Sequence, residues 1–104
     1  MASPFNPPFK GHAFQTRIGL SDTATAGSLT VNPTIAAGDF KVDIDGAGFT
    51  NLTNIPTVSP SGGRAVLISL TGLEMNGYII TVRGIDQTAT KEWADVLFTI
   101  LTVE

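Results

Sequence analysis

Side chains of the kinds that carry out catalysis are few in this 104-residue sequence, and they are not grouped. His12 is the only histidine and cysteine is absent, so a histidine-activated nucleophile would need this one imidazole beside it. No motif provides that pairing, and without cysteine neither a disulfide nor a thiolate metal site can form. We therefore expect a protein that is not an enzyme, with no catalytic residues and no cofactor.

Aspartates and glycines follow one another closely between Asp43 and Gly48, and such a segment can supply oxygen ligands to a calcium ion. The spacing does not fit an EF-hand loop, because the twelfth position counted from Asp43 is Asn54 and not a bidentate glutamate. A hairpin turn at Asp45-Gly46 explains the composition better. We expect no metal site here.

Two aromatic residues, Tyr78 and Trp93, are of the type that stacks on sugar rings. An aromatic side chain in a β-rich domain is more often buried in the core, and we favour that position for both. A carbohydrate-binding domain that uses Trp93 and Tyr78 is kept as a third functional hypothesis.

The charge pattern argues against two classes of partner. The formal net charge is −3, and the six basic residues are dispersed along the chain, so no basic patch is available for nucleic-acid phosphates. No apolar run reaches the roughly 20 residues of a membrane-spanning helix. We expect neither nucleic acid nor a membrane as a partner.

The elements that would position any site are strands. Residues 64–70 and 78–86 alternate in polarity, so that Val66, Ile68 and Leu70 share one face of the first strand. Further strands are expected over residues 13–20, 29–36 (interrupted at Pro33), 39–44, from 49, over 55–58 and over 92–103. In the 39–44 strand, Phe40, Val42 and Ile44 should point inward, and Asp39, Lys41 and Asp43 outward.

A single helical turn over residues 71–77 should join the two central strands. Thr71 and Glu74 have the spacing of a capping box, and Asn76-Gly77 should end the turn because both residues tolerate positive φ. A strand, a capped turn and then Tyr78 on the inner face of the next strand is typical of the corner between strands E and F of immunoglobulin-like sandwiches, where the tyrosine hydroxyl binds upstream backbone. The predicted fold is an all-β, immunoglobulin-like β-sandwich of about seven strands over residues 13–104.

The first twelve residues should form an extended arm. They contain three prolines and two phenylalanines, a composition that excludes a helix and is more aromatic than a free tail usually is. We expect the arm to bind a partner through Phe5, Pro7, Pro8 and Phe9.

The last strand is apolar on both faces. Ala94, Val96, Phe98 and Ile100 would lie on one face, and Trp93, Leu97 and Leu101 on the other. Only one face is needed for the core, so the arm or a neighbouring subunit could cover the second, or a bulge could reverse the alternation midway. We assign Trp93, Leu97 and Leu101 to partner binding together with the arm.

Several of these features together resemble small β-sandwich domains encoded among the structural genes of tailed bacteriophages. The resemblance covers residues 13 to 102, and its most telling parts are Asp45-Gly46 followed by Phe49, and Leu70 followed by Glu74-Met75-Asn76 before a strand. Such domains occur in capsid decoration, neck, tail and fibre-attachment proteins.

The resemblance implies a non-enzymatic virion role. We expect a capsid decoration, or cement, protein on the outer capsid surface, present in many copies or as a homo-oligomer, which braces the major capsid protein or other virion proteins through its arm and strand edges. A tail, neck or fibre-base component is the alternative.

Overall fold

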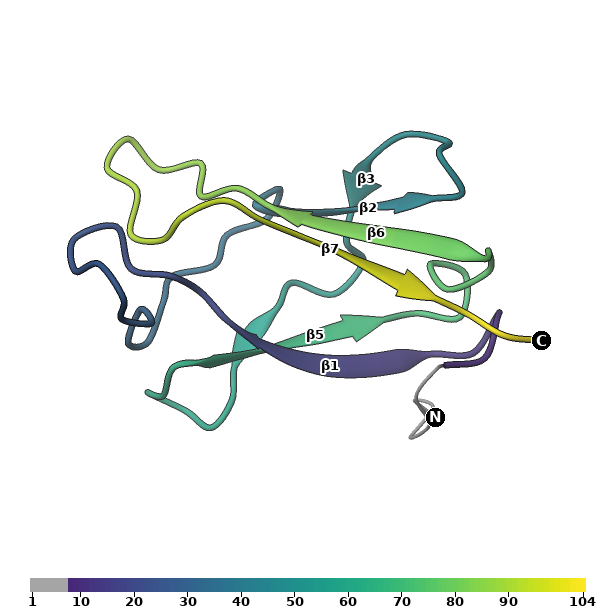
Figure 1. Cartoon of the computed structure of the whole chain (residues 1–104), viewed down its shortest axis with the longest axis horizontal. Helices are drawn as coiled ribbons and strands as arrows, with labels where there is room; N and C mark the ends of the chain where they lie inside the picture. The colour runs from purple at the N-terminus through teal and green to yellow at the C-terminus, as the bar shows by residue number, and fades with distance from the viewer. Residues whose placement is uncertain (1–7) are drawn as a thin grey trace.

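The computed structural model describes residues 8–104 (Figure 1). Its seven strands form two antiparallel sheets, and no helix occurs among the described residues. One sheet has the order β1 (Phe14–Gly19), β5 (Ala65–Leu70), β4 (Thr57–Val58), and the other has the order β3 (Thr50–Asn51), β2 (Phe40–Ile44), β6 (Ile79–Gly84), β7 (Val96–Leu101). The prediction of an all-β sandwich is therefore confirmed.

The core lies between the two sheets and follows the predicted alternation. Val66, Ile68 and Leu70 of β5 point inward, opposite Ile80 and Val82 of β6, and all five are buried. The other buried hydrophobic residues are Leu20, Phe40, Val42, Leu52, Met75, Trp93 and Ile100. When only one face of a strand is apolar, that face must point into the core, so the inward residues of these strands can be predicted from the sequence.

Trp93 does not share a face with Leu97 and Leu101, so that expectation is wrong. Its indole is fully buried and stacks on Phe40 with ring centroids 5.4 Å apart, in the core position favoured above for an aromatic. The cause lies in the chain before β7. Trp93 forms a bridge with Asp22, which follows β1 of the other sheet, and the regular alternation of β7 begins only at Val96.

The turn between β5 and β6 has the predicted capping box. The Thr71 N–H donates to Glu74 Oε1 at 2.8 Å, and the Glu74 N–H donates to Thr71 Oγ1 at 3.2 Å. The predicted left-handed ending is wrong, because neither Asn76 nor Gly77 has a positive φ. Gly77 is instead required by close packing, since a Cβ there would lie 2.5 Å from Cγ2 of Ile44.

Tyr78 does not form the predicted corner on the inner face. Strand β6 begins one residue later, at Ile79. Tyr78 therefore precedes the strand, and its ring is half exposed. Its hydroxyl donates to the Glu104 carboxylate at 2.6 Å and not to upstream backbone.

Two further expectations are corrected in the chain that precedes β2. Residues 29–36 are a loop with a single bridge from Leu29 to Ser21, because Asn32 takes a positive φ of 48° directly before Pro33. Asp39 is buried and does not face outward, because β2 begins only at Phe40. Its carboxylate accepts the Ala36 N–H at 2.9 Å and so closes this loop.

The described part of the N-terminal segment is bound to the domain. Phe9 forms a parallel bridge with Val103, in which the Lys10 N–H donates to the Val103 carbonyl at 2.8 Å and the Val103 N–H donates to the Pro8 carbonyl at 3.0 Å. Pro8 is buried. Phe5 and Pro7 lie outside the described residues.

Candidate protein-contact surface

An apolar strip lies on the outer face of β6 and β7, which run side by side (Figure 1). Ile79 is paired with Leu101 across the two strands, and Leu97 is paired with Arg83. The side chains of Ile79, Leu97 and Leu101 are 49%, 62% and 63% exposed. We call these three residues the β6–β7 strip, and such exposed apolar groups are typical of contact sites.

The strip continues into a mixed apolar and charged group where the N-terminal segment meets the domain. Val103 and Phe9, which bridge to each other, are both partly exposed beyond Leu101. Lys10 Nζ lies 4.3 Å from the centroid of the Tyr78 ring and 4.0 Å from a carboxylate oxygen of Glu104. A contact here would therefore combine apolar area with a cation and an anion.

The structure brings together only some of the residues assigned to partner binding. Leu97 and Leu101 lie on the strip and Phe9 lies near its end, whereas Pro8 and Trp93 are buried. Ile79 was not predicted from the sequence to lie on this surface, although the consecutive apolar residues Tyr78-Ile79-Ile80 indicate that one of them is exposed. Consecutive apolar residues in a pleated strand must place at least one on the outer face.

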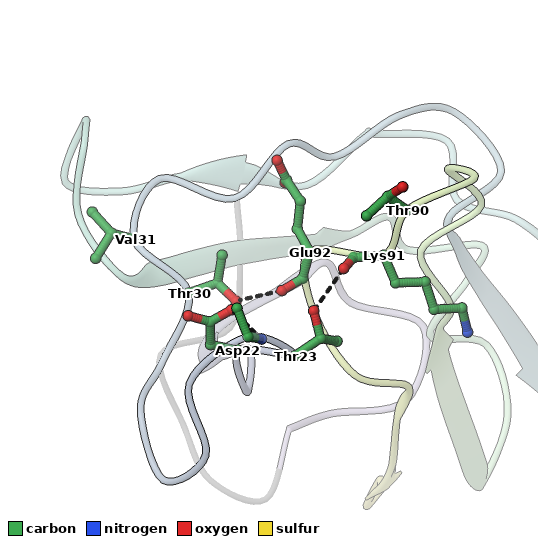
Figure 2. Close-up of a pocket in the computed structure, with 8 residues that line it drawn as sticks. Asp22, Thr23, Thr30, Val31, Thr90, Lys91 and Glu92 are labelled. Atoms are coloured by element: carbon green, nitrogen blue, oxygen red, sulfur yellow. Dashed lines mark hydrogen bonds between the residues drawn. The ribbon is translucent and has the colours of Figure 1, made fainter.

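The end of the sandwich opposite the C-terminus carries a pocket of about 430 Å³ between the β1–β2 and β6–β7 connections (Figure 2). Its polar side chains are bonded to neighbouring backbone: Thr23 Oγ1 donates to the Lys91 carbonyl at 2.6 Å, and Thr30 Oγ1 donates to the Glu92 carbonyl at 3.3 Å (Figure 2). The Asp22 carboxylate accepts the Ala24 N–H at 3.1 Å. These groups hold the two connections together and do not converge on the space between them.

Asp86 shows the same use of a carboxylate in the β6–β7 connection. It is 2% exposed and accepts the Thr88 hydroxyl at 2.8 Å, the Thr88 N–H at 3.0 Å and the Glu92 N–H at 2.8 Å. Burial by itself would raise the pKa of Asp86, but these hydrogen bonds outweigh it and lower the pKa below its ordinary value. The charged form of Asp86 is therefore part of the folded structure.

His12, the turn after Asp43 and the aromatic residue Trp93 lie in separate environments. His12 is exposed, and its ring meets the Phe9 ring edge-on at 6.0 Å. The Asp43 carboxylate accepts the N–H groups of Gly46 and Gly48, as expected for the hairpin turn. Within residues 8–104, no group of three or more potential ligands for a metal ion comes together. Trp93, one of the two aromatic residues considered for sugar stacking, is buried, so its indole presents no ring face to solvent.

The described chain contains no helix long and apolar enough to cross a membrane. Comparisons with family models, with curated proteins and with solved structures find no match for this chain.

Proposed function

We propose that this protein is a non-enzymatic structural component of a tailed bacteriophage virion, a capsid decoration protein that binds neighbouring capsomers through its N-terminal segment and its outer sheet face. The observation that supports this most directly is the β6–β7 strip beside the point where residues 1–7 join the domain. An exposed apolar face next to a proline- and phenylalanine-rich segment is suited to lying along a protein groove. Many copies of such a modest contact act together through multivalency.

We also propose that the sandwich is immunoglobulin-like. In that scheme β1, β5 and β4 correspond to strands B, E and D, and β3, β2, β6 and β7 correspond to C′, C, F and G. The connections β1–β2, β3–β4 and β5–β6 then each pass from one sheet to the other. An experimental structure with a different strand order would refute the scheme.

The functional proposal is tested with the first seven residues removed. The deletion should stop at Pro7 because Pro8 and Lys10 pair with Val103, and a longer deletion would disturb the sheet. The truncated protein should keep its thermal unfolding transition and lose binding to purified phage heads in a cosedimentation assay. Unchanged binding would remove the segment from the mechanism.

The strip is tested separately with Leu97→Lys. Leu73, which is 83% exposed in the turn between β5 and β6, gives the matched control Leu73→Lys. We expect the Leu97 variant to bind heads more weakly and the Leu73 variant to bind as the unmodified protein does. Binding to purified tails in place of heads would move the proposal to the tail, neck or fibre-base alternative.

A further inference from the structure

Two dipeptides that share one kind of chemical reactivity meet at the turn between β5 and β6. Asn76-Gly77 follows that turn, and Asp45-Gly46 follows β2. The Asp45 carboxylate joins them, because its Oδ1 accepts the N–H groups of Tyr78 and Ile79, both at 2.9 Å. An asparagine or aspartate before glycine is prone to cyclisation, since glycine has no side chain to shield its backbone nitrogen from the side chain before it.

The reaction is an attack of the glycine nitrogen on the side-chain carbonyl carbon of the preceding residue. At an asparagine, the new N–C bond closes a five-membered succinimide ring, the nitrogen loses its proton, and the carboxamide nitrogen leaves as ammonia. Water then opens the ring at either carbonyl, which gives aspartate or isoaspartate. An aspartate cyclises by the same attack and expels water, so its carboxylate must first take up a proton.

The structure protects Asp45 from this reaction. Its Oδ1 is held by the N–H groups of Tyr78 and Ile79, and hydrogen bonds to a charged acceptor are strong. The Gly46 N–H, which would have to attack, donates instead to Asp43 Oδ2 at 3.0 Å. Both reacting groups are therefore occupied, and hydrogen bonds must break before the two can meet.

The reacting groups of Asn76-Gly77 are not occupied by any described residue. Asn76 is exposed, and its carboxamide has no hydrogen-bond partner within residues 8–104. The Gly77 N–H also donates to none of these residues, although Gly77 is buried. Buried backbone N–H groups without a partner are rare in folded proteins. Closing the ring here requires a rotation about the Cα–C bond of Asn76 and breaks no hydrogen bond of either reacting group.

We propose that Asn76 is a site of spontaneous deamidation in the folded protein, and that Asp45, which also precedes a glycine, is protected. The site does not depend on the function proposed above, because the reaction needs only water. The other asparagines are poorer candidates, because the next residue either is proline and lacks an N–H or has a branched side chain. These dipeptides are Asn6-Pro7, Asn32-Pro33, Asn51-Leu52 and Asn54-Ile55.

Isoaspartate at position 76 would disturb the turn, because it adds one carbon atom to the main chain between two fixed neighbours. The Met75 carbonyl accepts the Gly11 N–H at 2.9 Å, and the Gly77 carbonyl accepts the Thr102 hydroxyl. Gly77 has little space to move, since even a Cβ there would lie 2.5 Å from Cγ2 of Ile44. We expect the bond to Gly11 to break, because segments near a chain terminus open most easily.

The test is incubation of the full chain at neutral pH in water enriched in the heavy oxygen isotope, followed by peptide mass mapping. Ring opening adds one labelled oxygen wherever cyclisation has occurred, at aspartate as well as at asparagine. Each position is compared with itself in the same protein unfolded by guanidinium chloride, so the intrinsic difference between the two dipeptides cancels.

Folding should slow the two positions to very different extents. Asn76 should react within about tenfold of its rate in the unfolded chain, because an exposed turn opens locally at low cost. Asp45 should be slowed by about a hundredfold or more, because two strong hydrogen bonds must break there. In the isoaspartate product, hydrogen exchange should show a less protected Gly11 amide and unchanged amides in β6.

Asn76→Gln and Asn54→Gln form the matched pair of variants. A glutamine cannot close the five-membered ring, so the Asn76 variant should take up no label at this position. Asn54 is also exposed, and its variant should leave labelling at Asn76 unchanged.

Three results would contradict the proposal. One is a folded protein that carries no label at Asn76 when the unfolded chain has reacted completely. Another is equal slowing of Asp45 and Asn76 by folding, because hydrogen bonding would then not distinguish them. The third is an isoaspartate product with a fully protected Gly11 amide, which would refute the loosening of the N-terminal segment. Head binding is not measured here, so this proposal and the proposed function can fail independently.

Discussion

Carboxylates in this protein serve mainly as acceptors for backbone N–H groups. Seven of the nine acidic residues do so, and most of them lie in loops and turns: Asp22, Asp39, Asp43, Asp45, Glu74, Asp86 and Glu92. Hydrogen bonds to a charged acceptor are stronger than those between neutral groups. The acidic composition therefore reflects how the long connections are held in place.

The role of the Asp86 carboxylate as a charged acceptor should make the stability of the folded protein depend on pH. Its pKa in the folded protein lies below the ordinary value of about 3.9 expected in the unfolded chain, so its contribution is complete above that value and is lost as pH falls through the folded pKa. Asp86→Asn should lower the free energy of unfolding by about 1–3 kcal/mol at neutral pH. Urea denaturation should show this difference shrinking in acid, and a difference that does not change with pH would contradict the role of the charge.

Gly77 is needed because there is no room for a side chain. A Cβ would lie 2.5 Å from Cγ2 of Ile44 and 2.7 Å from Oδ2 of Asp45, and that carboxylate holds the N–H groups of Tyr78 and Ile79. Gly77→Ala should therefore cost about 1–3 kcal/mol in thermal or urea unfolding.

The matched control for this substitution is Gly27→Asn. Gly27 has a positive φ, which asparagine tolerates, and nothing lies within 4 Å of a Cβ at that position. Only the backbone strain of the positive φ remains there, so we expect a smaller loss, of about 1 kcal/mol or less. An equal loss in both variants would show that packing against Ile44 is not the reason for Gly77.

The turn between β5 and β6 is also hydrogen-bonded to the chain between β3 and β4. Glu74 is buried, with one oxygen accepting the Thr71 N–H of its own turn and the other accepting the Thr53 N–H of the chain between β3 and β4 at 2.9 Å. The side chain thereby ties the β3–β4 connection to the turn through which the chain passes from β5 to β6 in the other sheet.

Glu74→Gln tests that connection. The amide keeps one acceptor oxygen but turns an NH₂ group toward a backbone N–H, so the free energy of unfolding should fall by about 1–3 kcal/mol. In hydrogen exchange, the Thr53 and Thr71 amides should lose protection before the amides of β6 do. Glu104→Gln, at an exposed carboxylate, is the control and should leave both amides unchanged.

The molecule as a whole has two different ends. One carries the long β1–β2 and β6–β7 connections, fastened to each other by threonine and carboxylate side chains (Figures 1 and 2). The other carries the C-terminus, the Phe9–Val103 bridge and the end of the β6–β7 strip. The head contact proposed above would therefore use this second end and the outer face of β6 and β7.

Local patterns were enough to predict strands β2, β5 and β6, the hairpin at Asp45-Gly46 and the capping box at Thr71. Each depends on residues a few positions apart, and alternation or cap spacing is a direct consequence of backbone geometry. Leu97 and Leu101 were found in the same way. These parts of the fold and of the candidate contact surface were encoded within short segments.

Contacts between distant segments decided the rest. The side toward which Trp93 points depends on where alternation restarts, and this is set by the bridge to Asp22 and the Ala94 N–H bond to Ser21. The place of the N-terminal segment beside the domain depends in the same way on the bridge of Phe9 to Val103. A pleated strand defines two faces but not which of them is covered, because covering a face requires partners that only the folded chain brings together.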